Sequence, residues 1–277
     1  MNENRQTGLK AHTGMWYFGT NTKMSMTDRE ALAYLEQLKD QLKDWQDAHT
    51  HAFVIPSFTV LSRAADVLRD SRIHIGAQNM AYEDKGQFTG EISPLSLKDI
   101  GVSIIEIGHS ERRHIFGESC EDTRRKVKKA LEHGFIPLLC VGETKEEKDC
   151  GISDEVLAIQ IKTAFYGLSE DAVGRCLIAY EPVWAIGVNG TPADPEYVDA
   201  RHKEIKMVLT GLLGPQAGRA IPVIYGGSVN RDNVRQLAAC KYVDGLFVGR
   251  AAWTAASYAE LLLESSAVYR ARLAEDS

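Results

Sequence analysis

The chain lacks the features of disulfide-stapled, zinc-binding and redox proteins. Its 277 residues include only five cysteines, and no two of them have CxxC spacing. An odd number of unpaired cysteines is typical of a reducing compartment such as the cytosol. The sequence also shows no clustered set of metal ligands, so we expect the protein to need neither a metal nor a cofactor.

Long apolar runs and an excess of basic residues are absent too. No apolar stretch approaches the roughly 20 residues that span a bilayer, and the polar N-terminus lacks the apolar core of a signal peptide. The 32 basic and 38 acidic residues give a net charge of −6, which argues against binding to nucleic acid or acidic membranes. We therefore expect a cytoplasmic protein with no nucleic-acid or membrane partner.

The pattern that is present is an alternation of short apolar runs with amphipathic stretches. A chain of this length fits two average domains or one α/β barrel. Eight runs are predicted to be strands: Met15–Gly19, Ala52–Ile55, Ile73–Ala77, Ile104–Ile107, Ile136–Val141, Leu177–Tyr180, Ile221–Tyr225 and Gly245–Val248. Eight βα units in series predict a single-domain TIM (β/α)8 barrel over residues 15–277, after a flexible extension at residues 1–14.

Helix signals separate these runs. Thr27 and Glu30 have the spacing of a capping box, and leucines follow at helical spacing as far as Trp45. A second helix is predicted from near Ser119 to just before Gly134, and a third from about Pro195 to Leu213.

Polar clusters follow five of the predicted strands. They are Gly19–Lys23, Gly108–Arg113, Glu181 with its loop, Tyr225–Ser228 and Gly249–Arg250. In a parallel barrel the carboxyl ends of the strands gather on one face, where active sites form. Clusters that are far apart in the sequence are therefore expected to meet at one mouth.

The residue types in these clusters predict one kind of chemistry. Glu181 stands at the end of a strand that Pro182 must terminate, and it can take a proton from carbon. His109 and Asn21 can polarise an adjacent carbonyl oxygen. Glycines after the last two strands let backbone N–H groups approach an anion, and Lys23 adds positive charge. Together they predict proton abstraction next to a carbonyl on a small phosphorylated sugar.

The sequence resembles the triosephosphate isomerase family over nearly all of residues 15–265. The motifs that carry the resemblance are Asn21-x-Lys23, Gly108–Arg113, Ala179–Gly187, Tyr225–Ser228, Cys140–Glu143 and Phe88–Glu91. That family is the standard case of a glutamate base paired with a neutral histidine.

The resemblance implies a role for each matching residue. Glu181 would be the base, and His109, kept neutral at a helix N-terminus, the electrophile. Lys23 would stabilise negative charge, Asn21 would hydrogen-bond substrate oxygen, and Glu111 would be a carboxylate on Lys23.

The resemblance also implies a phosphate site, a lid and a partner. Residues 182–192 would form a lid over the site. Thr89 would lie on a loop that enters the site of a second subunit, which implies a homodimer. Phosphate would be held by Gly187, Ser228, Gly249 and Arg250.

Three positions depart from the usual family pattern. Thr22 replaces a tryptophan, and Val188-Asn189-Gly190 replaces the end of the lid. Gly249-Arg250 replaces a glycine pair, and Trp253 follows it. These last residues are expected near the phosphate end of the site. The pattern resembles a sister group in the same family, the isomerases of four-carbon erythrulose phosphates.

The leading hypothesis is interconversion of D-glyceraldehyde 3-phosphate and dihydroxyacetone phosphate, which would place the enzyme in glycolysis and gluconeogenesis. The close rival is isomerisation of an erythrulose phosphate in sugar-alcohol catabolism. Two hypotheses from other classes are a Schiff-base aldolase that uses Lys23 and a non-catalytic barrel that binds phosphosugars.

Overall fold

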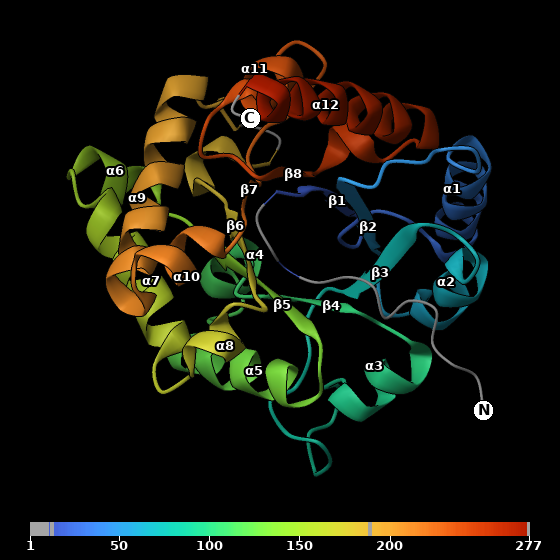
Figure 1. Ribbon diagram of the computed structural model, residues 1–277. Helices are drawn as coiled ribbons and strands as arrows, with labels where there is room; N and C mark the ends of the chain where they lie inside the picture. The colour runs from blue at the N-terminus through green and yellow to red at the C-terminus, as the bar shows by residue number, and fades with distance from the viewer. Residues whose placement is uncertain (1–10, 12–13, 188–189, 276–277) are drawn as a thin grey trace.

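The computed structural model describes residues 11, 14–187 and 190–275. In this part of the chain, eight parallel strands form a closed barrel with helices around it (Figure 1). The predicted (β/α)8 barrel is confirmed. The strands are β1 (Trp16–Asn21), β2 (Thr50–Ile55), β3 (Ile73–Ala77), β4 (Ile104–Ile107), β5 (Ile136–Val141), β6 (Leu177–Tyr180), β7 (Val223–Tyr225) and β8 (Gly245–Val248).

The strands follow one another around the barrel in chain order, and the barrel closes where β1 pairs with β8. Tyr17 is the register partner of Gly245 at this seam. Each parallel connection needs a crossover on the outside, which is where the helices lie.

Helices cover the outside of the barrel. The longer ones are α1 (Asp28–Gln41), α2 (Leu61–Leu68), α5 (Cys120–Glu132), α7 (Ser153–Phe165), α9 (Pro195–Leu213) and α12 (Ala255–Glu275). The shorter ones are α3 (Pro94–Ile100), α4 (Ser110–His114), α6 (Lys145–Asp149), α8 (Glu170–Val173), α10 (Pro215–Ala220) and α11 (Val234–Ala239), with 3₁₀ turns η1 (Val183–Ala185) and η2 (Arg250–Ala252).

Five strands have the bounds that the sequence predicted, and three differ. β2 begins at Thr50, two residues before the predicted Ala52. β1 continues to Asn21 instead of ending at Gly19, so Asn21 is the last residue of a strand. β7 begins at Val223 because Pro222 has no N–H to donate to the ladder, although its carbonyl accepts from Ile178 N.

Helix starts agree with the capping signals. Thr27 and Ser119 both form capping boxes, at the starts of α1 and α5. Pro195 opens α9, and Gly134 follows α5 with a φ of +77°.

Side chains alternate along each strand between the barrel interior and the helix layer. The interior is mostly apolar, with Tyr17, Phe53 and Phe247 as its large members. On β4, Ile104 belongs to this interior cluster, whereas Ile105 and Ile107 pack in the layer under the helices. The alternation places Glu106 inside the barrel.

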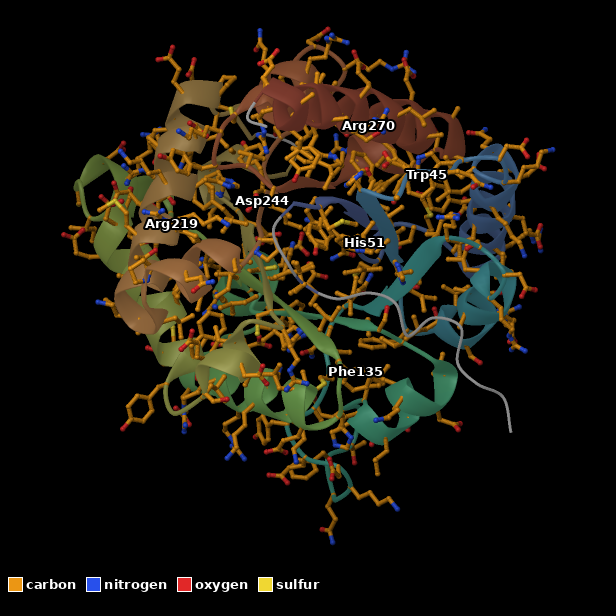
Figure 2. The ribbon with its side chains drawn as sticks, viewed as in Figure 1. Trp45, His51, Phe135, Arg219, Asp244 and Arg270 are labelled. Atoms are coloured by element: carbon orange, nitrogen blue, oxygen red, sulfur yellow. The ribbon has the colours of Figure 1, made fainter. Side chains whose placement is uncertain are left out.

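Charged residues gather at the end of the barrel where the strands begin. Figure 2 labels Asp244, which directly precedes β8, and His51 near the start of β2. Asp244 is ion-paired with Lys206 Nζ at 2.7 Å, and Arg270 is ion-paired with Asp47. These ion pairs lie at the amino ends of the strands, and the candidate site lies at the carboxyl ends.

In the part of the chain that the structure describes, no helix is both long and apolar enough to cross a membrane. The predicted N-terminal extension falls almost wholly on residues 1–10 and 12–13, which lie outside the described residues.

Candidate active site

One cavity of about 620 Å³ opens at the carboxyl ends of the strands. Its lining includes all nine predicted catalytic and phosphate-binding residues, which come from the end of β1 and from the segments after β1, β4, β6, β7 and β8. These residues are Asn21, Lys23, His109, Glu111, Glu181, Gly187, Ser228, Gly249 and Arg250.

Lys23 enters this cavity from a strained turn after β1. It is the one non-glycine residue with a positive φ (+53°) in the described part of the chain. The Asn21 side chain holds the turn by accepting from Lys23 N at 2.6 Å and from Gln78 Nε2 at 3.0 Å. Gln78 also donates to the Lys23 carbonyl. The Lys23 ammonium forms an ion pair with Glu111 at 2.7 Å.

His109 is the N-cap of α4, and its hydrogen bonds assign its tautomer. Its Nδ1 accepts from the backbone N–H of Glu111 at 3.2 Å, so this nitrogen carries no proton. In the neutral ring the proton is then on Nε2, which lies 3.6 Å from Glu181 Oε1. The arrangement presents a neutral N–H donor to the cavity beside a carboxylate.

Glu181 continues the ladder of β6 by one residue before Pro182 ends it. Its N–H donates to the Val141 carbonyl at 2.7 Å. Two glycines leave room for it: a methyl group at Gly142 would stand 1.9 Å from the Glu181 carbonyl oxygen, and one at Gly226 would stand 2.8 Å from Glu181 Cγ. The carboxylate is buried, and the Ser110 N–H points at its Oε2 from 3.4 Å.

The loop that begins with Pro182 is anchored by the buried carboxylate of Glu143. Glu143 accepts from Trp184 Nε1 at 3.0 Å, from Tyr197 OH at 2.8 Å and from Tyr180 OH at 3.0 Å. Near the far end of this loop, the Thr191 N–H donates a hydrogen bond to the Trp184 carbonyl. Residues 188–189 of the predicted lid lie outside the described residues.

Glycine-rich turns after β7 and β8 form the predicted phosphate end. A methyl group at Gly227 would stand 2.2 Å from the Tyr225 hydroxyl, so the turn needs glycine there. Ser228 Oγ donates to the Ala185 carbonyl at 2.7 Å and ties this turn to the loop after β6. Gly249 opens η2, and Arg250 is exposed at the rim.

Trp253 lines the same cavity, on the side of β1. Its indole N–H donates to the Asn21 carbonyl at 3.0 Å. It was expected near the phosphate end together with Arg250, and the structure adds this contact with the loop that carries Asn21 and Lys23.

Sequence reasoning missed Glu106, whose side chain is fully buried inside the barrel. Its Oε2 accepts from Asn21 Nδ2 at 2.7 Å, and its Oε1 lies 3.9 Å from His109 Nε2. The available signal was a carboxylate at an inward position of the apolar strand Ile104–Ile107. Gln78 was missed because its two hydrogen bonds to this loop come from the residue after β3, which is distant in sequence.

Burial raises the pKa of Glu106 to about 7. The Glu181 carboxylate acts in the same direction, whereas His109, the hydrogen bond from Asn21 and the charge of Lys23 act against this rise in pKa. The group therefore titrates in the physiological range.

Glu106, His109 and Glu181 each offer one ligand atom, and these atoms lie within 4.8 Å of one another. Two carboxylates and an imidazole are a donor set that a divalent cation can use. The expectation that no metal is needed stays a prediction.

The closed (β/α)8 barrel, with a buried carboxylate, a neutral imidazole and a lysine at one mouth, defines a barrel enzyme built for proton transfer beside a carbonyl. The model of the triosephosphate isomerase family matches residues 17–265, and the chain belongs to this family. It is an isomerase, a close relative of triosephosphate isomerase.

Curated relatives cover nearly the whole chain. An L-erythrulose-1-phosphate isomerase of Rhizobium etli is 46% identical over 252 residues, which are 91% of this chain and 92% of the relative. The enzyme of the same name from Rhizobium rhizogenes is 43% identical over 256 residues, 92% and 96% of the two chains. The one from Brucella abortus is 44% identical over 248 residues, 89% and 95% of the two chains.

These relatives correct the leading hypothesis about the substrate. The prediction that the chain interconverts D-glyceraldehyde 3-phosphate and dihydroxyacetone phosphate is wrong, because relatives at 43–46% identity over most of the chain carry the name of a four-carbon substrate. The motifs that suggested it predict proton-transfer chemistry, and this prediction does not depend on the carbon count. The expected roles in glycolysis and gluconeogenesis rested on the same prediction and are not confirmed.

The contact between Gly226 and Glu181 yields a first prediction. In Gly226→Ala the new methyl group must displace the Glu181 side chain, since the two would stand 2.8 Å apart. A displacement of about 1 Å can cost on the order of 100-fold in rate, so we expect kcat to fall by about that factor. The matched control is Gly211→Ala, where the methyl group meets open space. Steady-state kinetics that show equal kcat for both variants would contradict this view of Glu181.

The pKa of Glu106 yields a second prediction. A carboxyl group in the unfolded chain titrates near 4.5, whereas Glu106 in the folded protein titrates at about 7. The folded state thus keeps a proton that the unfolded state loses, and stability falls as the pH rises from 4.5 through 7. The shift corresponds to about 3 kcal/mol.

Glu106→Gln removes this titration. We expect the variant to gain about 3 kcal/mol of unfolding free energy relative to the natural protein between pH 5 and pH 8. Urea unfolding of both proteins at each pH measures the difference, and the other titrating groups cancel in it. A difference that does not change with pH would show that Glu106 is ionised throughout.

Proposed function

We propose that the protein isomerises a four-carbon ketose phosphate, L-erythrulose 1-phosphate. The observation that carries the proposal is the identity of 43–46%, over about nine tenths of the chain, to relatives that bear the name of this activity. The cavity supports it, since its lining joins the carboxylate and imidazole to glycine turns suited to a phosphate.

The chemistry follows from the substrate's bonds. The oxygen on C1 carries the phosphate, so C1 cannot become an aldehyde, and the carbonyl at C2 can move only to C3. A base removes the proton from C3, and an enediolate forms over C2 and C3. The hydroxyl proton moves from the C3 oxygen to the C2 oxygen, and the base returns its proton to C2. The product has its carbonyl at the former C3 and is an erythrulose 4-phosphate.

In this proposal Glu181 is the base that carries the proton between the two carbons. His109 donates from Nε2 to the oxygen that gains charge in the enediolate. Their separation of 3.6 Å supports this pairing, because one substrate carbon and its oxygen can meet both groups.

Positive charge and hydrogen bonds complete the proposed site. Lys23 stabilises the enediolate, Asn21 hydrogen-bonds a substrate oxygen, and Glu111 holds the Lys23 ammonium through the 2.7 Å ion pair. The phosphate is held by Gly187, Ser228, Gly249 and Arg250.

The alternatives from other classes fit the site less well. A Schiff-base aldolase needs a neutral Lys23 amine, whereas this amine is ion-paired with Glu111. A non-catalytic phosphosugar-binding barrel would not need a buried carboxylate beside an imidazole, since burying charge costs free energy.

We also propose that the enzyme is a homodimer of the cytosol. All five cysteines are free thiols, which supports a reducing compartment. Thr89 lies on an exposed loop after β3, next to Phe88, which is 44% exposed. Phe88 and Phe116 line one groove of about 260 Å³, and exposed apolar groups of this kind favour a partner surface.

The decisive test of the function compares substrates. We expect kcat/KM for L-erythrulose 1-phosphate to exceed that for dihydroxyacetone phosphate by on the order of 100-fold on one purified batch. Turnover of the triose alone would refute the four-carbon proposal.

Glu181→Asp is the control for isomerases carried over from the expression host. Shortening the side chain moves the carboxylate back by about 1 Å, so we expect kcat to fall on the order of 100-fold. Activity that survives the substitution in full belongs to a contaminant or to another base.

The homodimer is tested by light scattering after gel filtration. We expect twice the chain mass of 30.7 kDa. Thr89→Arg puts a charge into the proposed interface and should shift the mass toward one chain. Tyr166→Arg, at an exposed position after α7, is the control and should stay dimeric. A monomeric natural protein would exclude the proposal.

A further inference from the structure

Glu106 is a charged group in a place that is costly for charge. It lies on the inward face of β4, in a barrel interior whose other members are mostly apolar, and its side chain is fully buried. Replacing such a group by an apolar one of similar size is often neutral or stabilising. A carboxylate kept here therefore calls for a function that an apolar residue could not perform.

Only one of the two Glu106 oxygens has a strong partner. Oε2 accepts from Asn21 Nδ2 at 2.7 Å. Among the described residues, the hydrogen-bond donor to Oε1 is the weak thiol of Cys140, at 3.9 Å. Buried carboxylate oxygens are normally satisfied by good donors. Oε1 is thus an acceptor with spare capacity, and it faces His109 Nε2 at 3.9 Å.

The position of Glu106 relative to the phosphate end is fixed by topology. The glycine turns follow β7 and β8, and β4 is on the opposite side of the eight-stranded ring (Figure 1). A substrate whose phosphate lies at those turns and whose carbons react beside Glu181 and His109 points its far end toward β4. Ligand atoms of Glu181, His109 and Glu106 lie within 4.8 Å of one another, so a substrate atom held by the first two is close to the third.

A four-carbon substrate has one group at this far end that a triose phosphate lacks. In L-erythrulose 1-phosphate the reacting carbons are C2 and C3, and the C4 hydroxymethyl lies beyond them, away from the phosphate. Resting on the proposed function, we propose that Glu106 is the specificity residue for this group, with Oε1 accepting a hydrogen bond from the C4 hydroxyl.

Such a contact would produce discrimination. Sites built to hydrogen-bond a substrate hydroxyl reject the analogue that lacks it, because the buried polar group is then left unpaired. A triose phosphate would leave Oε1 without its donor.

The test uses Glu106→Leu and two substrates, L-erythrulose 1-phosphate and dihydroxyacetone phosphate. The substitution removes the acceptor at similar volume. We expect kcat/KM for the tetrulose to fall roughly 10- to 100-fold more than kcat/KM for the triose. Ile104→Val, also inward-facing on β4, is the matched control and should leave the ratio of the two values unchanged.

Glu106→Gln covers the case in which the leucine variant does not fold. It keeps an acceptor for Asn21 and the side-chain volume, and we expect it to lower the tetrulose-to-triose ratio less than leucine does. Equal losses on both substrates in every Glu106 variant would overturn the inference, because Glu106 would then only hold Asn21. A natural protein that does not turn over the tetrulose would overturn the proposed function as well.

Discussion

The pairing of β1 with β8 is the interaction on which the rest of the structure depends. It closes a sheet of eight parallel strands and thereby brings five separate loops to one mouth. Backbone approaches backbone closely at this seam: a methyl group on Gly245 would stand 2.1 Å from the Tyr17 carbonyl oxygen. The bond from Trp253 to Asn21, which spans 232 positions in the chain, exists only because the barrel is closed.

The site gives up stability in order to hold its groups in place. Lys23 has a left-handed backbone conformation that Asn21 and Gln78 maintain, and Glu106 is a carboxylate among apolar side chains. Both features cost free energy in the folded state, and both contact Asn21, which lines the cavity. The large apolar core of the barrel stabilises the fold enough to tolerate these two destabilising features.

Much of the architecture could be predicted from local pattern. The apolar runs predicted the bounds of β3 to β6 and of β8. The capping boxes at Thr27 and Ser119 predicted where two helices start. The nine site residues share a cavity because each ends a strand or lies in the segment that follows a strand's carboxyl end. The triose substrate was predicted wrongly, since the motifs near Glu181 and His109 describe the reacting carbons and say nothing about what lies beyond them.

The sequence by itself therefore determined the strand and helix order, the barrel and the type of chemistry, because periodicity, caps and motif residues are local properties of the chain. Only the tertiary structure decided which side chains meet inside the barrel. The contact of Glu106 with Asn21 and the approach of Gly226 to Glu181 join strands that are distant in sequence. No local pattern encodes such distances, since they follow from the register and closure of the whole sheet.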